Sequence, residues 1–470
     1  MLTLSVETLV AVTGGTLVWG STDTMVNGVS TDSRTLEPGA VFVAFPGEQV
    51  DGHAFLADAI ASGARTLLIT RGSEEIGDVV ESATRRDVAI VRVPDALGAI
   101  QALARHHRER LFCPVIGITG STGKTTTKEF LTSVLGTRMK VVATRGNRNN
   151  ELGVPLTVMS AGADTDVLVV EMAMRGRGQI ADLCRIARPT MGLVTNVGVS
   201  HIELLGTQDS IAAAKAELVE AIAEDGVVFL NGDDTYSDTL ALSSRAPVAR
   251  YGLGDTCSVR AVDIEMDEES RASFVIVADD VSVPISLSVP GRHNVYNALA
   301  AAAIGLRLRM DLADIAAGLA RASAGEMRMQ AFTTAGGVHV INDAYNANPT
   351  SMRAAVDTVA GITTAQRRIA VLGDMAELGS LAELAHFRIG EQVAGLPIDI
   401  LVTVGERASR IADGARAVGM DPDRVRPCAT ADEASEVLDD LLEPGDVVLV
   451  KASRVMGLER VVEGIVEPRV

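Results

Sequence analysis

The chain of 470 residues is too long for one ordinary hydrophobic core, and at roughly 100 to 200 residues per domain its length predicts about three domains. Hydrophobic residues make up 47% and charged residues 22%, a composition that is typical of globular proteins and excludes a largely disordered chain. The formal net charge of -19 disfavours binding to nucleic-acid polymers, so any phosphate site has to be made locally.

The N-terminus and the cysteines indicate a compartment. No uninterrupted apolar run reaches the ~18 to 20 residues that a membrane-spanning helix needs, and the N-terminus lacks the basic and apolar regions of a secretory signal. We therefore expect a cytoplasmic monomer without a membrane span. The cysteines lack the close spacing of a zinc or disulfide framework, and we expect buried free thiols at Cys113, Cys184, Cys257 and Cys428.

Residues 1–113 predict a small mixed α/β domain. The pattern of apolar residues indicates short strands and helices at 41–44, 55–62, 66–70 and 97–110. The last of these helices contains the adjacent pair His106 and His107 among arginines and glutamates. Because neighbours in sequence do not share a helix face, we expect both on a solvated surface rather than in a metal site.

Strands and helices alternate regularly in residues 114–325. Near-continuous apolar strands separated by helices predict a parallel sheet that helices cover. These strands are expected at 115–119, 141–144, 167–172, 192–197 and 227–231. Between 258 and 289 the apolar period drops to two, which predicts an antiparallel appendage, and an Ala-rich helix follows Arg292.

Residues 326–470 repeat the alternation and predict a Rossmann-like domain, with strands at 338–342, 369–372, 400–404 and 447–450. The overall prediction is an α/β protein of three domains. Ligands of such sheets bind beyond the carboxyl ends of the strands, where helix capping and turn formation are the competing roles for polar residues. The candidates at these positions are Asp343, Asp374, Gly405 and Lys451.

A glycine-rich segment after the apolar stretch 115–119 predicts a phosphate-binding loop. The order of strand, glycine loop and helix start lets successive backbone N–H groups point at phosphate oxygens, while Lys124 neutralises charge on the β- and γ-phosphates and Thr125 offers a hydroxyl to Mg²⁺. The strict GxxxxGK pattern would need glycine at Ile118, so the match is to a shorter GxxGKT form. The expected ATP-binding residues are Gly120, Ser121, Thr122, Gly123, Lys124, Thr125 and Thr126.

Three further motifs complete the pattern: GNRNNELG at 146–153, NDAYNANP at 342–349 and LGDMAELG at 372–379. Together with the short phosphate loop, they make the chain resemble the Mur ligase family of peptidoglycan-precursor enzymes over nearly its whole length. The resemblance implies an ATP-dependent ligase, and the three motifs look like those of the member that joins D-alanyl-D-alanine to UDP-N-acetylmuramoyl-tripeptide through an acyl phosphate.

Glu171 ends an apolar strand, where it would project into a cleft and offer Mg²⁺ an oxygen ligand; a solvent-facing strand end is the alternative. The resemblance implies that Glu171 and His201 bind a second Mg²⁺.

The resemblance also implies that Lys215 is carbamylated by CO₂, which turns a cation into an anion near metal. From the residues alone, Lys215 reads as an exposed helix lysine paired with Glu217 or Glu220. Lys124, His201 and Lys215 are the expected catalytic residues.

Asn294 and Asn297 are three residues apart on one face of the Ala-rich helix and could hydrogen-bond the adenine edge; helix capping by Asn294 is the competing role. The resemblance implies that Arg328 reaches the ATP phosphates from the third domain and that Asp343 holds the ribose.

On the substrate side, the segments 30–34, 45–48 and 51–55 look like the family's UDP-binding region, in which hydroxyls and a guanidinium suit a diphosphate. Turn formation explains these residues equally well. Lys451 could meet the carboxylate of the dipeptide. The expected substrate-binding residues are Ser33, Arg34, Asn149, Asn150, Tyr345, Asn346, Asn348 and Lys451.

Two alternatives stay open. The sibling ligase that adds the third amino acid shares the core motifs, but its Asp-Asn-Pro-Arg motif is absent. Residues 421–424 read Asp-Pro-Asp-Arg and resemble that motif only superficially. A phosphate-loop ATPase or nucleotide sensor would close on ATP without making a bond, and it would have no need of a carbamate at Lys215.

Overall fold

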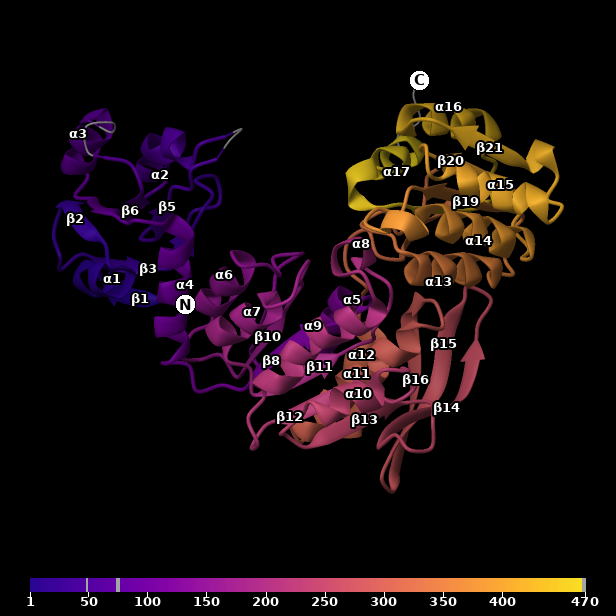
Figure 1. Ribbon diagram of the computed structural model, residues 1–470, viewed down its shortest axis with the longest axis horizontal. Coiled ribbons are helices and arrows are strands. Elements are labelled where there is room, and N and C mark those ends of the chain that lie inside the picture. The colour runs from indigo at the N-terminus through magenta and orange to yellow at the C-terminus, as the bar shows by residue number, and fades with distance from the viewer. Residues whose placement is uncertain (48–49, 73–76, 467–470) are drawn as a thin grey trace. The chain divides into compact units, whose positions relative to one another are not determined.

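The computed structural model describes residues 1–47, 50–72 and 77–466 (Figure 1). The chain forms two compact units. The first unit comprises Met1–Ile118, Met139–Met174 and Gly178–Gly192, and the second comprises Thr119–Arg138, Arg175–Arg177 and Leu193–Val470. The fold is α/β, as the sequence predicts, whereas the domain boundaries at 113 and 325 stay a prediction.

The N-terminal part of the first unit is built on a five-stranded sheet with the order β2-β7-β6-β5-β4. All residues of β6 are buried, and on one face of the sheet α2 and α3 supply apolar side chains to a core that includes Leu56, Leu67 and Ile90. The predicted elements are found, although the expected helix 55–62 starts as a 3-10 turn. The elements are β1 (Thr3–Ser5), α1 (Val6–Thr13), β2 (Thr16–Trp19), β3 (Met25–Asn27), β4 (Val29–Ser30), β5 (Val41–Val43), η1 (Gly52–Phe55), α2 (Leu56–Ala61), β6 (Thr66–Ile69), α3 (Gly77–Arg85), β7 (Ala89–Arg92) and α4 (Ala96–Arg108).

The prediction of a solvated histidine pair is wrong for His107. Its side chain is buried, and Nε2 lies 2.8 Å from the carbonyl oxygen of Ala161. Helix α4 packs against α6 (Gly153–Ser160) and α7 (Gln179–Ala187) of the same unit, so a polar residue on its inner face is covered. Burial lowers the pKa of the His107 imidazole, which keeps the ring neutral as a core residue.

The rest of the first unit contains three parallel strands in the order β9-β10-β8. Strands β8 and β10 are buried along their whole length, which explains their uninterrupted apolar sequences. The elements are β8 (Val115–Thr119), β9 (Val141–Ala143), α6 (Gly153–Ser160), β10 (Val167–Glu171) and α7 (Gln179–Ala187), and β11 (Met191–Val194) runs from this unit into the second.

The second unit begins with the phosphate-loop helix α5, which packs against α11 and α12. Strands β12 to β14 are parallel, and β14 to β16 form the antiparallel appendage that the period of two predicts. The elements are α5 (Lys124–Leu135), α8 (Ile202–Leu205), α9 (Gln208–Ala221), β12 (Val227–Asn231), α10 (Ser237–Leu242), β13 (Val248–Gly252), β14 (Val259–Met266), β15 (Arg271–Ala278), β16 (Val281–Pro290), α11 (Asn294–Arg307) and α12 (Leu312–Arg321).

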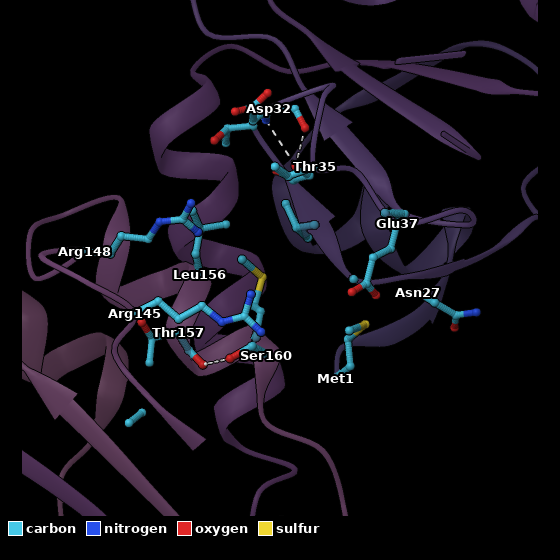
Figure 2. A pocket seen from close by; sticks show the side chains of 17 residues that line it. Met1, Asn27, Asp32, Thr35, Glu37, Arg145, Arg148, Leu156, Thr157 and Ser160 are labelled. Atoms are coloured by element: carbon cyan, nitrogen blue, oxygen red, sulfur yellow. Dashed lines mark hydrogen bonds between the residues drawn. The ribbon is translucent and has the colours of Figure 1, made fainter. Parts of the chain in front are cut away.

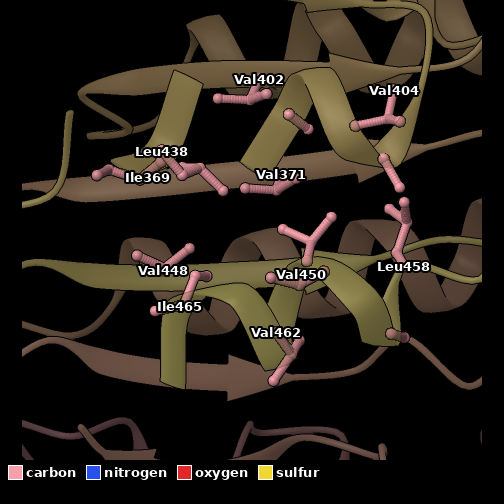
Figure 3. Packing of buried hydrophobic residues seen from close by; sticks show 14 of the residues in the cluster. Ile369, Val371, Val402, Val404, Leu438, Val448, Val450, Leu458, Val462 and Ile465 are labelled. Atoms are coloured by element: carbon pink, nitrogen blue, oxygen red, sulfur yellow. The ribbon is translucent and has the colours of Figure 1, made fainter. Parts of the chain in front are cut away.

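The C-terminal part of the second unit is a six-stranded sheet with the order β17-β18-β22-β19-β20-β21. All neighbours are parallel except β17 and β18. Figure 3 shows valines of β19, β20 and β22 packed against Leu438, Val462 and Ile465 of α16 and α17. The sequence analysis missed the edge strands β17 and β21. The elements are β17 (Gln330–Thr333), β18 (His339–Asn342), α13 (Pro349–Ala360), β19 (Arg368–Gly373), η3 (Gly379–Leu381), α14 (Ala382–Ala394), β20 (Ile400–Val404), α15 (Ser409–Ala417), η4 (Pro422–Arg424), β21 (Val425–Cys428), α16 (Ala431–Leu441), β22 (Val447–Lys451), η5 (Arg454–Met456) and α17 (Glu459–Val466).

The four cysteines are free thiols, of which Cys184, Cys257 and Cys428 are buried and Cys113 is partly exposed. None of the helices in the described ranges combines the length and the apolar character that crossing a membrane requires.

Candidate active site

The loop from Gly120 to Gly123 has a backbone that only glycine allows at its two ends. Gly120 has φ +152°, and a Cβ there would lie 1.8 Å from Oγ1 of Thr195. Gly123 has φ +79°, and a Cβ there would lie 2.7 Å from Oδ1 of Asn297. Helix α5 starts at Lys124, so the loop delivers backbone N–H groups and a positive helix end to one place. The Lys124 ammonium donates to the Gly120 carbonyl at 2.6 Å and thus lies over the loop.

Two residues that the sequence analysis missed hold this loop in shape. Asn196 accepts from the backbone N–H of Thr122 at 3.0 Å through Oδ1, and its backbone carbonyl accepts from Ser121. Thr195 donates its hydroxyl to the Thr122 carbonyl at 2.6 Å. Both residues directly follow strand β11, and their place just past a strand end was the signal that could have identified them.

The loop lines a pocket of the second unit together with residues from the C-terminal sheet. The pocket gathers most residues that the sequence analysis assigned to ATP, and it also takes in Asn346, Asn348 and Lys451 from the expected substrate side. The predicted residues that line it are Ser121, Thr122, Gly123, Lys124, Thr125, Thr126, Asn294, Asn297, Arg328, Asp343, Asn346, Asn348 and Lys451.

Asp343 and Lys451 face each other in this pocket. Each follows or ends one of the neighbouring parallel strands β18 and β22, so their side chains meet at the same sheet edge. The Lys451 ammonium donates to Oδ2 of Asp343 at 2.6 Å and to the Asn346 carbonyl at 2.9 Å, while Oδ1 of Asp343 accepts from the Met329 N–H at 3.1 Å. Lys451 therefore orients Asp343 in the nucleotide pocket, and its expected contact with the dipeptide stays a prediction.

The other two cleft candidates lie elsewhere in the C-terminal sheet. Asp374 accepts from the Ala408 N–H at 2.7 Å, and a Cβ on Gly405 would lie 2.6 Å from the Asp374 carboxylate. These contacts correspond to the turn-forming alternative for both residues.

The guanidinium of Arg328 stacks over the Tyr345 ring, with Cζ 4.1 Å from the ring centroid. This cation–π contact holds a long side chain at the pocket wall, where a planar guanidinium can pair with phosphate oxygens. Tyr345 itself does not line the pocket; in this structure its ring supports Arg328.

The two asparagines expected at the adenine edge hydrogen-bond each other, and their contact with adenine stays a prediction. Asn297 donates from Nδ2 to Oδ1 of Asn294 at 2.8 Å, Asn294 donates to the Pro290 carbonyl, and Asn297 accepts from the Thr127 hydroxyl. Tyr296, which the sequence analysis missed, also lines the pocket. Burial and the nearby Asp233 raise the pKa of Tyr296 to about 12, so its hydroxyl stays a hydrogen-bond donor.

Lys215 is buried in helix α9, which contradicts the interpretation as an exposed lysine. Burial and the charge of Lys124 lower its pKa well below the ordinary value of a lysine, although Asp234 acts in the opposite direction. His201, in the turn before α8, is partly buried, and desolvation lowers its pKa against the opposing effect of Glu377. Lys124 and Lys215 also act on His201, so these three expected catalytic residues share one electrostatic environment.

Glu171 lies in the first unit at the end of β10 and is almost fully buried, which contradicts a solvent-facing strand end. Asn149 donates from Nδ2 to Oε1 of Glu171 at 2.7 Å and so fixes the direction of the carboxylate. Asn150 accepts from the Gly153 N–H and serves as a turn residue before α6.

A second pocket lies within the first unit (Figure 2). Arg145 and Arg148, which follow strand β9, lie on one side of it, and Asp32 and Glu37 lie on another. Two guanidinium groups at one pocket suit a diphosphate. The sequence analysis assigned neither arginine a role, although their place just past a strand was a usable signal.

The predicted pair Ser33 and Arg34 does not line this pocket. Ser33 is buried, and the Arg34 guanidinium pairs with both oxygens of Asp32 at 2.9 and 2.7 Å while its side chain stays 85% exposed. Hydrogen bonds from Arg34 lower the pKa of Asp32 to about 2. Glu48, in the expected segment 45–48, lies outside the described residues.

Comparison with known families gives matches along most of the chain. The matched descriptions are the Mur ligase middle domain over residues 118–305, the Mur ligase glutamate ligase domain over 327–454 and the Mur ligase family catalytic domain over 25–108.

Individual relatives match over nearly their full length. The chain is 36% identical to a UDP-N-acetylmuramoyl-tripeptide–D-alanyl-D-alanine ligase of Bacillus subtilis, with 94% of each chain covered. It is 40% identical to the enzyme of the same name from Mycobacterium tuberculosis, with 93% of this chain and 92% of the relative covered.

Solved structures also match the chain over nearly its whole length. A crystal structure of MurF from Acinetobacter baumannii superposes with a TM-score of 0.86 at 30% identity, covering 99% of both chains. MurF of Thermotoga maritima in complex with ADP superposes with a TM-score of 0.77 at 27% identity, covering 93% of this chain and 96% of the other. The chain, with its three-domain architecture, belongs to the Mur ligase family.

Proposed function

We propose that the protein catalyses the ATP-dependent ligation of D-alanyl-D-alanine to UDP-N-acetylmuramoyl-tripeptide, the step that forms the pentapeptide precursor of peptidoglycan. The observation that carries the proposal is the pocket in which the glycine loop, Lys124 and the ion pair of Asp343 with Lys451 come together. Relatives that bear the name of this ligase match the chain over nearly its full length.

ATP binds with its phosphates against the loop from Gly120 to Thr126. The N–H groups at the start of α5 and the Lys124 ammonium offset the negative charge of the β- and γ-phosphates, and Arg328 adds a third positive group from the C-terminal sheet. Asp343, oriented by Lys451, accepts hydrogen bonds from the ribose hydroxyls. Phosphoryl transfer depends chiefly on such positioning and charge stabilisation.

In the first step, an oxygen of the tripeptide carboxylate attacks the γ-phosphorus, the bond to the β–γ bridging oxygen breaks, and ADP leaves. In the second step, the dipeptide amine attacks the acyl carbon of the resulting acyl phosphate. The tetrahedral intermediate loses a proton and inorganic phosphate, which leaves the new amide bond. Lys124 stabilises charge on the transferred phosphoryl group in both steps.

The residues present fit Mg²⁺. Within the described residues no cluster of three or more His, Cys, Asp or Glu forms a closed metal cage. The buried Glu171 carboxylate, which Asn149 holds at 2.7 Å, is the kind of oxygen ligand that Mg²⁺ prefers, and Mg²⁺ usually takes one or two protein ligands besides nucleotide phosphates and water. Thr125 would be the ligand beside the loop, and Glu171 and His201 would each offer Mg²⁺ a further ligand. When bound, Mg²⁺ offsets the repulsion between the anionic nucleophile and the γ-phosphate.

The environment of Lys215 supports its carbamylation. Burial and the neighbouring Lys124 lower the pKa of Lys215 well below that of an ordinary lysine, which increases the share of the neutral amine, the form that reacts with CO₂. A carbamate would add a negative charge to the electrostatic environment that Lys215 shares with Lys124 and His201, where it could bind metal or orient its ligands.

UDP-N-acetylmuramoyl-tripeptide binds through its diphosphate at the pocket of the first unit, with Arg145 and Arg148 as the cations. The two pockets lie in different compact units, and we assign one phosphorylated substrate to each of them.

Phosphate release from ATP tests the function. With the UDP-tripeptide present, we expect release to depend on D-alanyl-D-alanine and to match formation of the UDP-pentapeptide by mass spectrometry. Phosphate release that does not depend on D-alanyl-D-alanine contradicts the proposal and favours an ATPase or nucleotide sensor. Replacing the dipeptide by single diamino acids, with the UDP-dipeptide as acceptor, tests the sibling ligase, for which we expect no product.

A further inference from the structure

The motif Leu372–Gly379 has no part in the reaction as proposed, yet one of its side chains contacts a catalytic residue. Oε2 of Glu377 lies 2.5 Å from Nδ1 of His201, and Oε1 lies 3.9 Å from Nε of Arg175. The contact between Glu377 and His201 joins the C-terminal part of the second unit to the turn that precedes α8. The two atoms are in contact, but their geometry is not that of a hydrogen bond, and Nδ1 of His201 is buried.

The backbone at both ends of this contact is unusual. His201 has φ +62° and Glu377 has φ +59°, a left-handed conformation that is unfavourable for a residue with a side chain. Such conformations persist where the surroundings enforce them, and they cluster at functional sites. In this case the Glu203 N–H donates to the Glu377 carbonyl at 3.3 Å, so the two turns also hold each other through the backbone.

A second motif of the C-terminal part holds the same turn. Asn348 donates from Nδ2 to the Ser200 hydroxyl at 2.9 Å, one residue before His201. A Cβ added to Gly379 would lie 3.3 Å from Cβ of Glu203, so the side chain of Glu203 occupies the space next to this glycine. The turn at residues 200–203 is therefore positioned by Asn348, Glu377 and Gly379, all of which come from the C-terminal sheet and its loops.

The contact between Glu377 and His201 corresponds to the usual surroundings of a metal-binding histidine. A histidine that binds a metal through one ring nitrogen commonly offers the other to a carboxylate, which fixes the orientation of the ring. Since Nδ1 of His201 faces Glu377, Nε2 is the nitrogen left for the metal. Loss of such a partner typically weakens metal affinity or activity by about 10- to 100-fold.

We propose that Glu377 is a positioning residue for His201, through which the C-terminal part of the protein completes the metal site of the central part. The inference rests on the proposed role of His201 as a metal ligand. It assigns the LGDMAELG motif a task in the reaction: the metal site is complete only when the loop that carries Glu377 is docked against the turn at 200–203.

Binding of Mn²⁺ to the complex with ADP, followed by electron paramagnetic resonance, tests the proposal without turnover. We expect Glu377→Gln to weaken Mn²⁺ binding by about 10-fold or more. The matched control is Glu383→Gln, which removes a carboxylate from an exposed position at the start of α14, and we expect it to bind Mn²⁺ like the wild type. Equal Mn²⁺ affinity of the two variants overturns the proposal.

A double-mutant cycle separates positioning from simple structural support. In the His201→Ala background, Glu377→Gln should cause no further loss of Mn²⁺ affinity, and thermal melting of each variant checks that folding is intact. A full additional loss in that background shows that Glu377 acts independently of His201 and refutes the inference. If His201→Ala leaves Mn²⁺ binding unchanged, the metal role of His201 fails together with this inference, whereas dipeptide-dependent phosphate release by the wild type still decides the proposed function.

Discussion

At the residue scale, burial decides which charged side chains can serve the chemistry. Lys215 and Lys451 are both almost completely buried, yet their surroundings differ. Lys451 is paired with the Asp343 carboxylate at 2.6 Å and orients its partner. For Lys215, desolvation and the neighbouring Lys124 outweigh the attraction of Asp234, so the pKa of the amine lies well below its ordinary value.

The carbamate that we propose at Lys215 is testable by substitution. Lys215→Ala should lower the rate of ligation by about 100-fold or more, because an anion close to the metal and phosphates is lost. Small carboxylates such as formate or propionate should restore part of the rate. The exposed Lys140, substituted as Lys140→Ala, is the control and should keep the wild-type rate.

The wild type provides the complementary measurement. Because the Lys215 pKa is lowered, the reactive neutral amine persists at a lower pH than in an ordinary lysine, and acidification through this pKa should remove the carbamate and the activity. Bicarbonate should raise activity in CO₂-depleted buffer. Indifference to CO₂, together with no rescue of Lys215→Ala, rules the carbamate out.

The arginines of the first unit provide a second prediction. Arg145→Ala or Arg148→Ala should raise KM for the UDP-tripeptide by about 10- to 100-fold, since a charge-assisted hydrogen bond contributes about 1.5 to 3 kcal/mol. KM for ATP should not change. Arg105→Ala, on the exposed face of α4, serves as control. Arg34→Ala tests the diphosphate site that was expected from the sequence against the pocket with Arg145 and Arg148. A larger effect at Arg34 than at Arg145 and Arg148 would move the diphosphate away from this pocket.

At the scale of elements, helix α13 has a cap with two tasks. Asn348 and Ser351 form a capping box at its start, and the same Asn348 side chain donates to Ser200. A helix end is thus used both to satisfy its own backbone and to hold the turn that carries His201.

Comparing two helix caps separates these tasks. Asn348→Ala and Thr430→Ala, the latter at the start of α16, should each lower the free energy of unfolding by about 1 kcal/mol in urea denaturation. Only Asn348→Ala should also reduce kcat/KM for ATP, by about three- to tenfold, because it alone loses a hydrogen bond to the catalytic turn. Equal kinetics of the two variants would show that Asn348 is only a cap.

At the scale of the whole molecule, the pockets that we propose for the two phosphorylated substrates are separate. One pocket belongs to the first compact unit and the other to the second. The attacking carboxylate and the γ-phosphorus must come within about 3 to 3.5 Å of each other for reaction. Ligand binding should therefore bring the units together.

Small-angle X-ray scattering measures this closure. We expect the radius of gyration to fall when a non-hydrolysable ATP analogue and the UDP-tripeptide are added together, because bound ligands favour the conformation that contacts both. Each ligand alone is the control and should cause a smaller change. Unchanged dimensions with both ligands would refute closure.

Sequence by itself determined the α/β class, the parallel strands and the phosphate loop. These follow from local rules: continuous apolar runs for β8 and β10, a period of two for β14 to β16, and glycines ahead of a helix that starts at Lys124. The short edge strands β17 and β21 escaped prediction, because a half-exposed edge carries a weak apolar pattern.

Tertiary structure alone decided which polar residues meet. His107 is buried because α4 packs on its neighbours, Asn294 and Asn297 bond each other, and Glu377 reaches His201 from 176 positions along the chain. Such contacts depend on how strands are ordered in the sheets and how loops at their ends face one another. No local pattern of residue types encodes that order, so the sequence predicted the chemical groups of the site but not their partners.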